Sequence, residues 1–245
     1  MSTYEIVRFG HVGLGTVALL SFWTGALLRK GGAPHKAAGK VFLLSMALLL
    51  VLSVPMTWII WIKQSRVLAA FLAYLIVLVS GGVWRAWRAI RDRNDFRRYT
   101  GPVFKALALA NLASGLGVLG LGLSVRAPLL AGFSLIGVAS GVAMLRFAAR
   151  PPADPRWWLK EHLSEMLGNG VATHIAFLSI GLPRLLPALN TPAWTYTAWF
   201  GPVALMYVAQ YFLRRKYLTP LQSQRSSRTN TAPSSTLSGN LAVGS

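Results

Sequence analysis

Long apolar runs, separated by short polar turns, make up most of the chain. Most runs are close to the roughly 20 residues that an α-helix needs to cross the hydrocarbon core of a bilayer. The alternation of a membrane barrel strand is absent, and lipid-embedded backbone groups must be satisfied inside a helix or a closed barrel. We therefore predict an all-α, polytopic bundle of seven transmembrane helices that forms one domain, residues 1–218. The predicted spans are Phe9–Leu28, Val41–Ile62, Val67–Trp84, Ala106–Val125, Leu129–Leu145, Met166–Leu182 (extended back to about Leu159) and Trp194–Leu213.

The chain changes character after the last run. From Thr219 to Ser245 it is rich in Ser, Thr, Pro and Gly. Such a segment cannot bury enough apolar surface to offset the entropy lost on folding. We predict that residues 219–245 form a disordered polar tail in the cytoplasm.

Basic residues are distributed unevenly between alternate loops. Of the 25 Lys and Arg residues, 20 fall in alternate loops and the C-terminal segment, and 5 fall on the other side. The positive-inside rule then places the N-terminus outside and the C-terminus in the cytoplasm of a cell with an inner (plasma) membrane. Seven spans, an odd number, also place the two termini on opposite sides of the membrane, so the loop charges and the number of spans agree.

Composition limits the classes of partner that the chain is expected to bind. It is 54% hydrophobic and only 13% charged, with a mean hydropathy of +0.50 and a formal net charge of +19. No soluble basic domain is left outside the apolar runs, so we predict anionic lipid headgroups at the cytoplasmic face, and no nucleic acid, as partners. The absence of cysteine excludes disulfides, iron–sulfur clusters and thiolate metal sites. Oligomeric state is left open.

Glycines in two of the predicted spans have a structural explanation. Gly115, Gly117 and Gly120 spell G-x-G-x-x-G, but they lie inside an apolar run and not between a strand and a helix. Gly137 and Gly141 form a G-x-x-x-G pair in the next run. Both sets are typical of close helix packing through small residues in a membrane bundle.

Four histidines are the main candidates for chemistry. His35 and His162 begin the second and sixth spans on the cytoplasmic side, whereas His11 and His174 lie toward the outer side. They are either hydrogen-bonded packing residues or ligands of b-type haem or a transition metal. One feature argues against haem. His162 and His174 are twelve residues apart and point about 120° apart on an ideal helix, so one helix would have to serve two differently directed haem sites.

The sixth span begins with acidic residues beside a histidine, in the stretch WWLKEHLSEMLGNGVATH. Glu161 and Glu165 either complement the helix dipole or form a proton or cation uptake site with His35 as a partner. Asn169, one turn further on, is a polar partner for the same site. We predict that His35 and His162 approach each other and share one polar site near these acids.

Two segments resemble a family of bacterial predicted membrane proteins of unknown function. The first is HVGLGTVALLSFWTGALLRKGGAPHKAAGKVF, in which a span that begins with His is followed by the turn His35-Lys36-x-x-Gly39-Lys40-x-Phe42. The second is the sixth span, with Lys160, His162 and Met166 at matching places. The resemblance covers Phe9 to about Leu213 and implies that His11, His35 and His162 matter; it names no chemistry.

The sequence thus supports an integral inner-membrane protein and leaves three functions open. The first is a His-ligated b-haem or metal redox protein. The second is a small-solute or proton-coupled transporter, and the third is a non-catalytic membrane scaffold.

Overall fold

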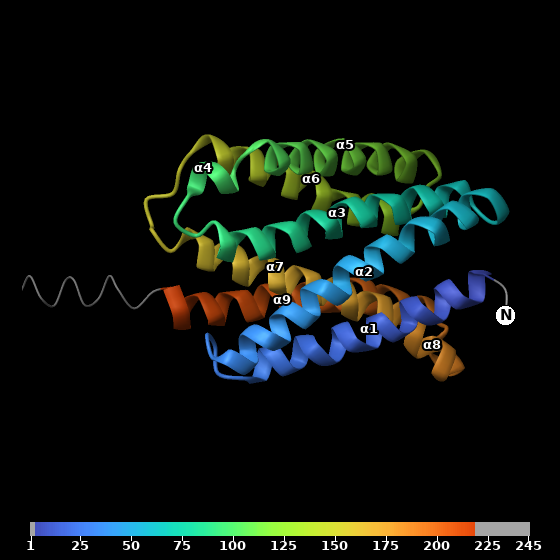
Figure 1. Ribbon diagram of the computed structural model, residues 1–245. Coiled ribbons are helices and arrows are strands. Elements are labelled where there is room, and N and C mark those ends of the chain that lie inside the picture. Colours follow the sequence, from blue (N-terminus) through green and yellow to red (C-terminus); the bar gives the residue numbers. More distant parts are fainter. Residues whose placement is uncertain (1–2, 219–245) are drawn as a thin grey trace, which may run out of the picture.

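The computed structural model describes residues 3–218, and Figure 1 shows them as a bundle of helices that run lengthwise past one another. No strand occurs in this part of the chain, so the predicted all-α class is confirmed. The predicted polar tail, 219–245, lies outside the described residues. The seven helices of 20 or more residues are α1 Thr3–Leu27, α2 Ala33–Lys63, α3 Arg66–Arg91, α5 Pro102–Ser124, α6 Pro128–Ala149, α7 Trp157–Ala176 and α9 Pro192–Leu218.

Short helical turns complete the bundle. The four-residue helix α4, Phe96–Tyr99, lies between α3 and α5. Helix α7 continues through a π-helical turn, η1 Phe177–Gly181, into α8 Leu182–Leu185, and η2 Pro187–Leu189 leads on to α9. Pro183 lacks a backbone N–H and lies just beyond the widened turn, where the regular helix gives way.

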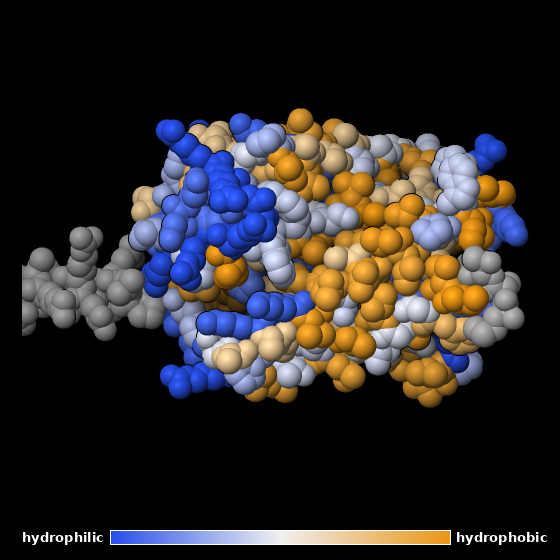
Figure 2. All heavy atoms as spheres, viewed as in Figure 1, coloured by the Kyte–Doolittle hydropathy of each residue, from blue (hydrophilic) through white to orange (hydrophobic). Residues whose placement is uncertain are grey.

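Six of these helices are long and apolar enough to cross a membrane by length and composition, which supports an integral membrane protein with several crossings. They are α1, α2, α3, α5, α6 and the continuous segment Trp157–Leu185. Helix α9 has 27 residues but is not among the six, because its tyrosine, tryptophan and proline residues lower its mean hydropathy. Figure 2 shows hydrophilic residues gathered at the bundle end that carries α4, and hydrophobic residues over the middle of this face.

Turn residues explain where the long helices begin. Pro34, Pro102 and Pro128 each stand in the first turn of their helix, where a missing N–H costs nothing. Gly31 has φ of 81°, a left-handed conformation that favours glycine, and it reverses the chain between α1 and α2. The α3 helix is capped by Ser65, whose hydroxyl accepts a hydrogen bond from the Leu68 amide.

Glycines bring α5 and α6 into close antiparallel contact. A Cβ added to Gly115 would lie 2.8 Å from the Val138 nitrogen, and one added to Gly141 would lie 2.7 Å from the Ala108 oxygen. Gly117 and Gly120 have nothing within 4 Å of such a Cβ. The predicted packing function is therefore confirmed for Gly115 and Gly141, but Gly117 and Gly120 do not contribute to it.

Aromatic side chains fix the bundle end that carries α4. The Tyr99 ring is fully buried, 4.9 Å from the Trp157 ring and 5.2 Å from the Phe104 ring. Trp84 stacks against it from α3 at 6.0 Å. Such aromatic pairs stabilise beyond the area they bury. They hold α4 against the first turn of α7, which is where the polar residues converge.

Candidate functional site

A buried arginine joins α3 to α7. The Arg85 guanidinium forms an ion pair with Glu165 through Nη2, and the same nitrogen lies 3.5 Å from Glu161 Oε2. The three side chains are only 12–15% exposed. All three belong to helices that are long and apolar enough to cross a membrane. We call Arg85, Glu161 and Glu165 the Arg85 site.

Two hydroxyl groups complete the surroundings of the Arg85 site. Tyr99 donates a hydrogen bond to Glu161 Oε2 at 3.1 Å, and Arg85 Nη1 donates to Ser140 Oγ on α6 at 3.4 Å. Burial, and next the negative charge of Glu161, raise the pKa of Tyr99. The phenol therefore keeps its proton at neutral pH and remains a donor to the carboxylate. Four helices, α3, α4, α6 and α7, supply the site.

The acids begin a polar stripe along α7. Glu161, Glu165, Asn169 and Thr173 follow one another at intervals of four residues, so each is a neighbour of the one before it, and the row turns by about 120° around the helix from Glu161 to Thr173. Asn169 and Thr173 are 2% and 7% exposed. Asn169 donates to the Glu165 carbonyl at 2.8 Å, and Thr173 donates to the Asn169 carbonyl at 3.0 Å. The stripe rises about 18 Å along α7 from Glu161 to Thr173.

A small residue on α3 allows this stripe to pack closely. A Cβ added to Gly82 would lie 3.1 Å from Asn169 Oδ1 and 3.3 Å from Glu165 Oε2. These distances are tighter than ordinary van der Waals contact, so a larger residue would push against both polar groups. Gly82 therefore lets the amide and the carboxylate lie directly against the α3 backbone.

His162 lies beside the Arg85 site, because it follows Glu161 on α7 and contacts Ala86, the residue after Arg85 on α3. Its Nδ1 is 3.1 Å from the carbonyl oxygen of Ala86, which follows Arg85. Since a carbonyl only accepts, Nδ1 carries the hydrogen and Nε2 of the neutral ring is the acceptor. His35 has the same arrangement, with Nδ1 2.9 Å from the Gly25 oxygen. Neither Nε2 atom has a hydrogen-bond partner among residues 3–218.

The packing of α2 on α7 indicates that His35 and His162 lie at the same level. A Cβ added to Gly39 would lie 3.8 Å from the Met166 methyl group, and the Thr173 hydroxyl lies 3.3 Å from the sulfur of Met46. In each pair the two residues are 127 positions apart in the sequence, and an equal separation is what two parallel helices in register give. His35 and His162 are also 127 positions apart and stand one turn before the first pair.

The other two histidines lie elsewhere. His174 uses both ring nitrogens: Nδ1 is 2.7 Å from the Gly170 oxygen, and Nε2 accepts from the Trp23 indole at 3.0 Å. His11 lies twelve residues before Trp23, or about 18 Å along α1. These contacts do not bring His11 and His174 together as an outer pair, and both nitrogens that could ligate haem iron in His174 are engaged. In the described residues no group of three or more His, Asp or Glu side chains could hold a metal ion.

Sequence reasoning identified part of the Arg85 site. It selected Glu161, Glu165, Asn169, His35 and His162, which lie along α7 or at the facing end of α2. It missed Arg85, Tyr99 and Ser140. Arg85 directly follows the predicted end of the third span and was counted with the loop charges. The structure continues α3 seven residues past the predicted end, to Arg91, and the Arg85 side chain faces the bundle interior.

Comparison with protein-family models, with curated proteins and with solved structures finds no match for this chain. The family resemblance of the His35 turn and of the sixth span therefore stays a prediction.

Proposed function

We propose that this chain is a seven-span transporter of the inner membrane that couples the movement of a small solute to proton binding and release at the Arg85 site. Its N-terminus lies outside and its C-terminus in the cytoplasm. The resemblance to the bacterial family of predicted membrane proteins is kept as part of this proposal, with His35 and His162 as residues of the proton path.

The unequal number of charges at the Arg85 site carries the proposal. One guanidinium faces two carboxylates, so the three side chains have a net charge of −1 when both acids are ionised. An uncompensated charge is costly inside a membrane bundle, and a bound proton or cation removes that cost. Two carboxylates beside one arginine therefore favour a site that alternates between loaded and unloaded states.

The polar stripe supplies the proton path in this proposal. It begins at Glu161, near the bundle end that the loop charges assign to the cytoplasm, and ends at Thr173, about 18 Å further along α7. The hydrocarbon core is about 30 Å thick, so the stripe covers little more than half of it. Thr173 contacts the apolar Met46, and the next position of the row, four residues on, is the apolar Phe177. A path that is polar on one side and closed on the other is what alternating access needs in one of its states.

Contacts at both ends of α9 support the seventh span. Near its start, the Trp194 indole donates to the Leu178 oxygen at 2.9 Å. At its end, Arg156 at the start of α7 donates to the Leu218 oxygen at 2.6 Å. Helix α9 therefore extends beside the whole of α7 and η1, a segment that is itself long enough to cross a membrane.

Infrared difference spectroscopy of the full chain in liposomes tests the site. Changing the pH should produce the C=O stretching band of a protonated carboxylic acid, because one of the two acids takes up a proton. Glu165→Gln should abolish this band. Lys160→Gln, which removes an exposed charge one residue before Glu161, should leave it unchanged.

Transport is measured in the same liposomes with a trapped pH dye. Mixtures of amino acids, of sugars and of nucleosides are added outside, and one of them should change the internal pH in the wild type but not in Glu165→Gln. Absence of both the carboxylic acid band and any solute-dependent pH change would contradict the proposal.

A further inference from the structure

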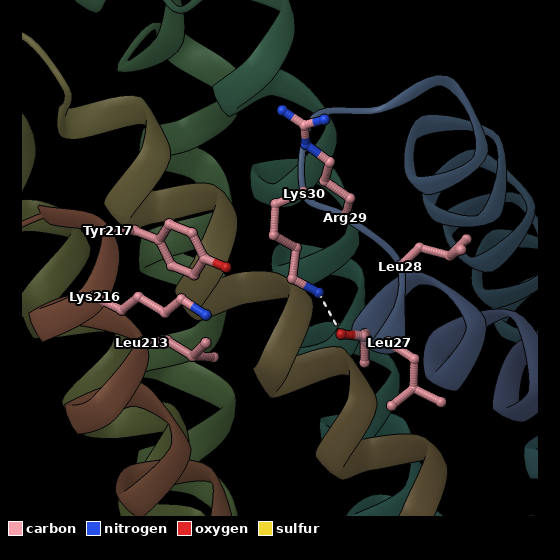
Figure 3. A pocket seen from close by; sticks show the side chains of 8 residues that line it. Leu27, Leu28, Arg29, Lys30, Leu213, Lys216 and Tyr217 are labelled. Carbon is pink, nitrogen blue, oxygen red and sulfur yellow. Dashed lines mark hydrogen bonds between the residues drawn. The ribbon is translucent and has the colours of Figure 1, made fainter.

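A basic pocket opens at the junction of the first loop and the end of α9. Its volume is about 500 Å³, and Figure 3 shows Lys30 and Lys216 reaching into the space between α1 and α9. Arg29 and Tyr217 add a third cation and a phenol. The leucines among its lining residues include Leu27 and Leu213, and none of the lining residues is acidic.

The structure holds the Lys30 ammonium in place at this pocket. Its Nζ donates to the Gly25 oxygen at 2.9 Å and to the Ala26 oxygen at 2.5 Å, both in the last turn of α1. These carbonyls have no intrahelical partner at a helix end, so the lysine serves as their cap. The ammonium is therefore held against the last turn of α1, and Lys216 lines the same pocket from α9 (Figure 3).

The two lysines repel each other in the unliganded pocket. Burial, and next the positive charge of Lys216, lower the pKa of Lys30. No carboxylate among the lining residues relieves this repulsion. An anion between the two ammonium groups would relieve it, and lysine ammonium groups and a phenol hydroxyl are suitable donors to phosphate oxygens.

We infer that this pocket binds the phosphate group of an anionic phospholipid, with the acyl chains running along the leucines beneath it. The position of the pocket favours a lipid over free phosphate. Leu27 is 81% exposed and ends a helix that is long and apolar enough to cross a membrane. Apolar side chains directly below a cluster of cations match the boundary between acyl chains and headgroups. This site is separate from the Arg85 site and does not depend on the proposed transport.

Native mass spectrometry of the full chain in a neutral detergent tests the lipid site. Phosphatidylglycerol should bind with a fixed stoichiometry, and phosphatidylcholine of the same chain length should bind more weakly. Lys216→Gln should weaken phosphatidylglycerol binding about fivefold, since each lysine near a headgroup contributes about 1 kcal/mol. Lys216 is the better first variant, because Lys30 also caps α1. The Lys30→Gln, Lys216→Gln double variant should weaken binding about 25-fold.

Two controls separate the pocket from general surface charge and from free phosphate. Lys160→Gln removes one charge from an exposed position outside the pocket and should leave binding unchanged. Inorganic phosphate and glycerol 1-phosphate should not displace the lipid at equal concentration. Equal binding of the two lipids, no effect of Lys216→Gln, or displacement by inorganic phosphate would overturn the inference.

Discussion

Arg85 is the one cation of the Arg85 site. It lies between two acids, and without it both carboxylates would remain in a buried environment with Tyr99 as a remaining donor. Removing one member of a buried ion pair leaves an uncompensated charge, which is more damaging than removing the pair. The residue therefore stabilises the bundle and, in the proposed transporter, balances part of the charge of the two acids.

We predict that Arg85→Ala lowers the free energy of unfolding by about 3–5 kcal/mol. Combining it with Glu165→Gln should recover part of that loss, because the second change removes one of the stranded charges. Thermal or denaturant unfolding in micelles, followed by circular dichroism, measures all three variants. Simple additivity of the two single changes would show that the residues are not coupled.

The candidate site was predictable where residue type alone was informative. Glutamates and histidines are rare inside apolar helices, so Glu165 and His162 stood out by composition. Arg85 did not, because an arginine after a tryptophan at the end of an apolar run looks like a loop charge. Only the continuation of α3 past Trp84 to Arg91 turns its side chain toward α7.

At the scale of elements, apolar runs located each long helix but misjudged its ends. Helix α2 begins at Ala33 and α7 at Trp157, earlier than Val41 and about Leu159. Proline and basic residues in first turns belong to these helices, but they interrupt the apolar run by which a span is recognised. The π-helical turn η1 has no distinct sequence signal either, although Pro183 marks the region.

The contact between α5 and α6 gives a prediction with an internal control. Gly141→Ala should destabilise the bundle by about 1–3 kcal/mol, because the new methyl group meets backbone and side-chain atoms of Ala108 and Leu112 at 2.7–2.8 Å. Gly117→Ala meets nothing within 4 Å and should be neutral or slightly stabilising, since alanine favours the helix. Unfolding in micelles compares them, and an equal loss for both variants would contradict the observed register.

For the whole molecule, the alternating direction of the long helices bears on the proposed topology. In Figure 1 the first turn of α1 and the last turn of α9 lie at opposite ends of the bundle. The turn that contains α4 and the loop between α6 and α7 lie at the same end as the last turn of α9. This is the end that the uneven distribution of Lys and Arg assigns to the cytoplasm.

Reporter fusions at five positions test this topology, and the last one tests α9. Alkaline phosphatase, active only outside, should be active after Gln64 and Arg126. A green fluorescent reporter, which folds only in the cytoplasm, should fluoresce after Asp95, Asp154 and Lys216. Helix α9 decides the last result: if it crosses, Lys216 shares the side of Asp154, and if it lies along the outer surface, Lys216 shares the side of Arg126. The hydrogen bond from Arg156 to Leu218 joins the two ends of α7 and α9 that must share a side in the first case. Phosphatase activity at Lys216 would therefore show that α9 does not cross the membrane, and it would contradict the arrangement in which α7 and α9 cross side by side.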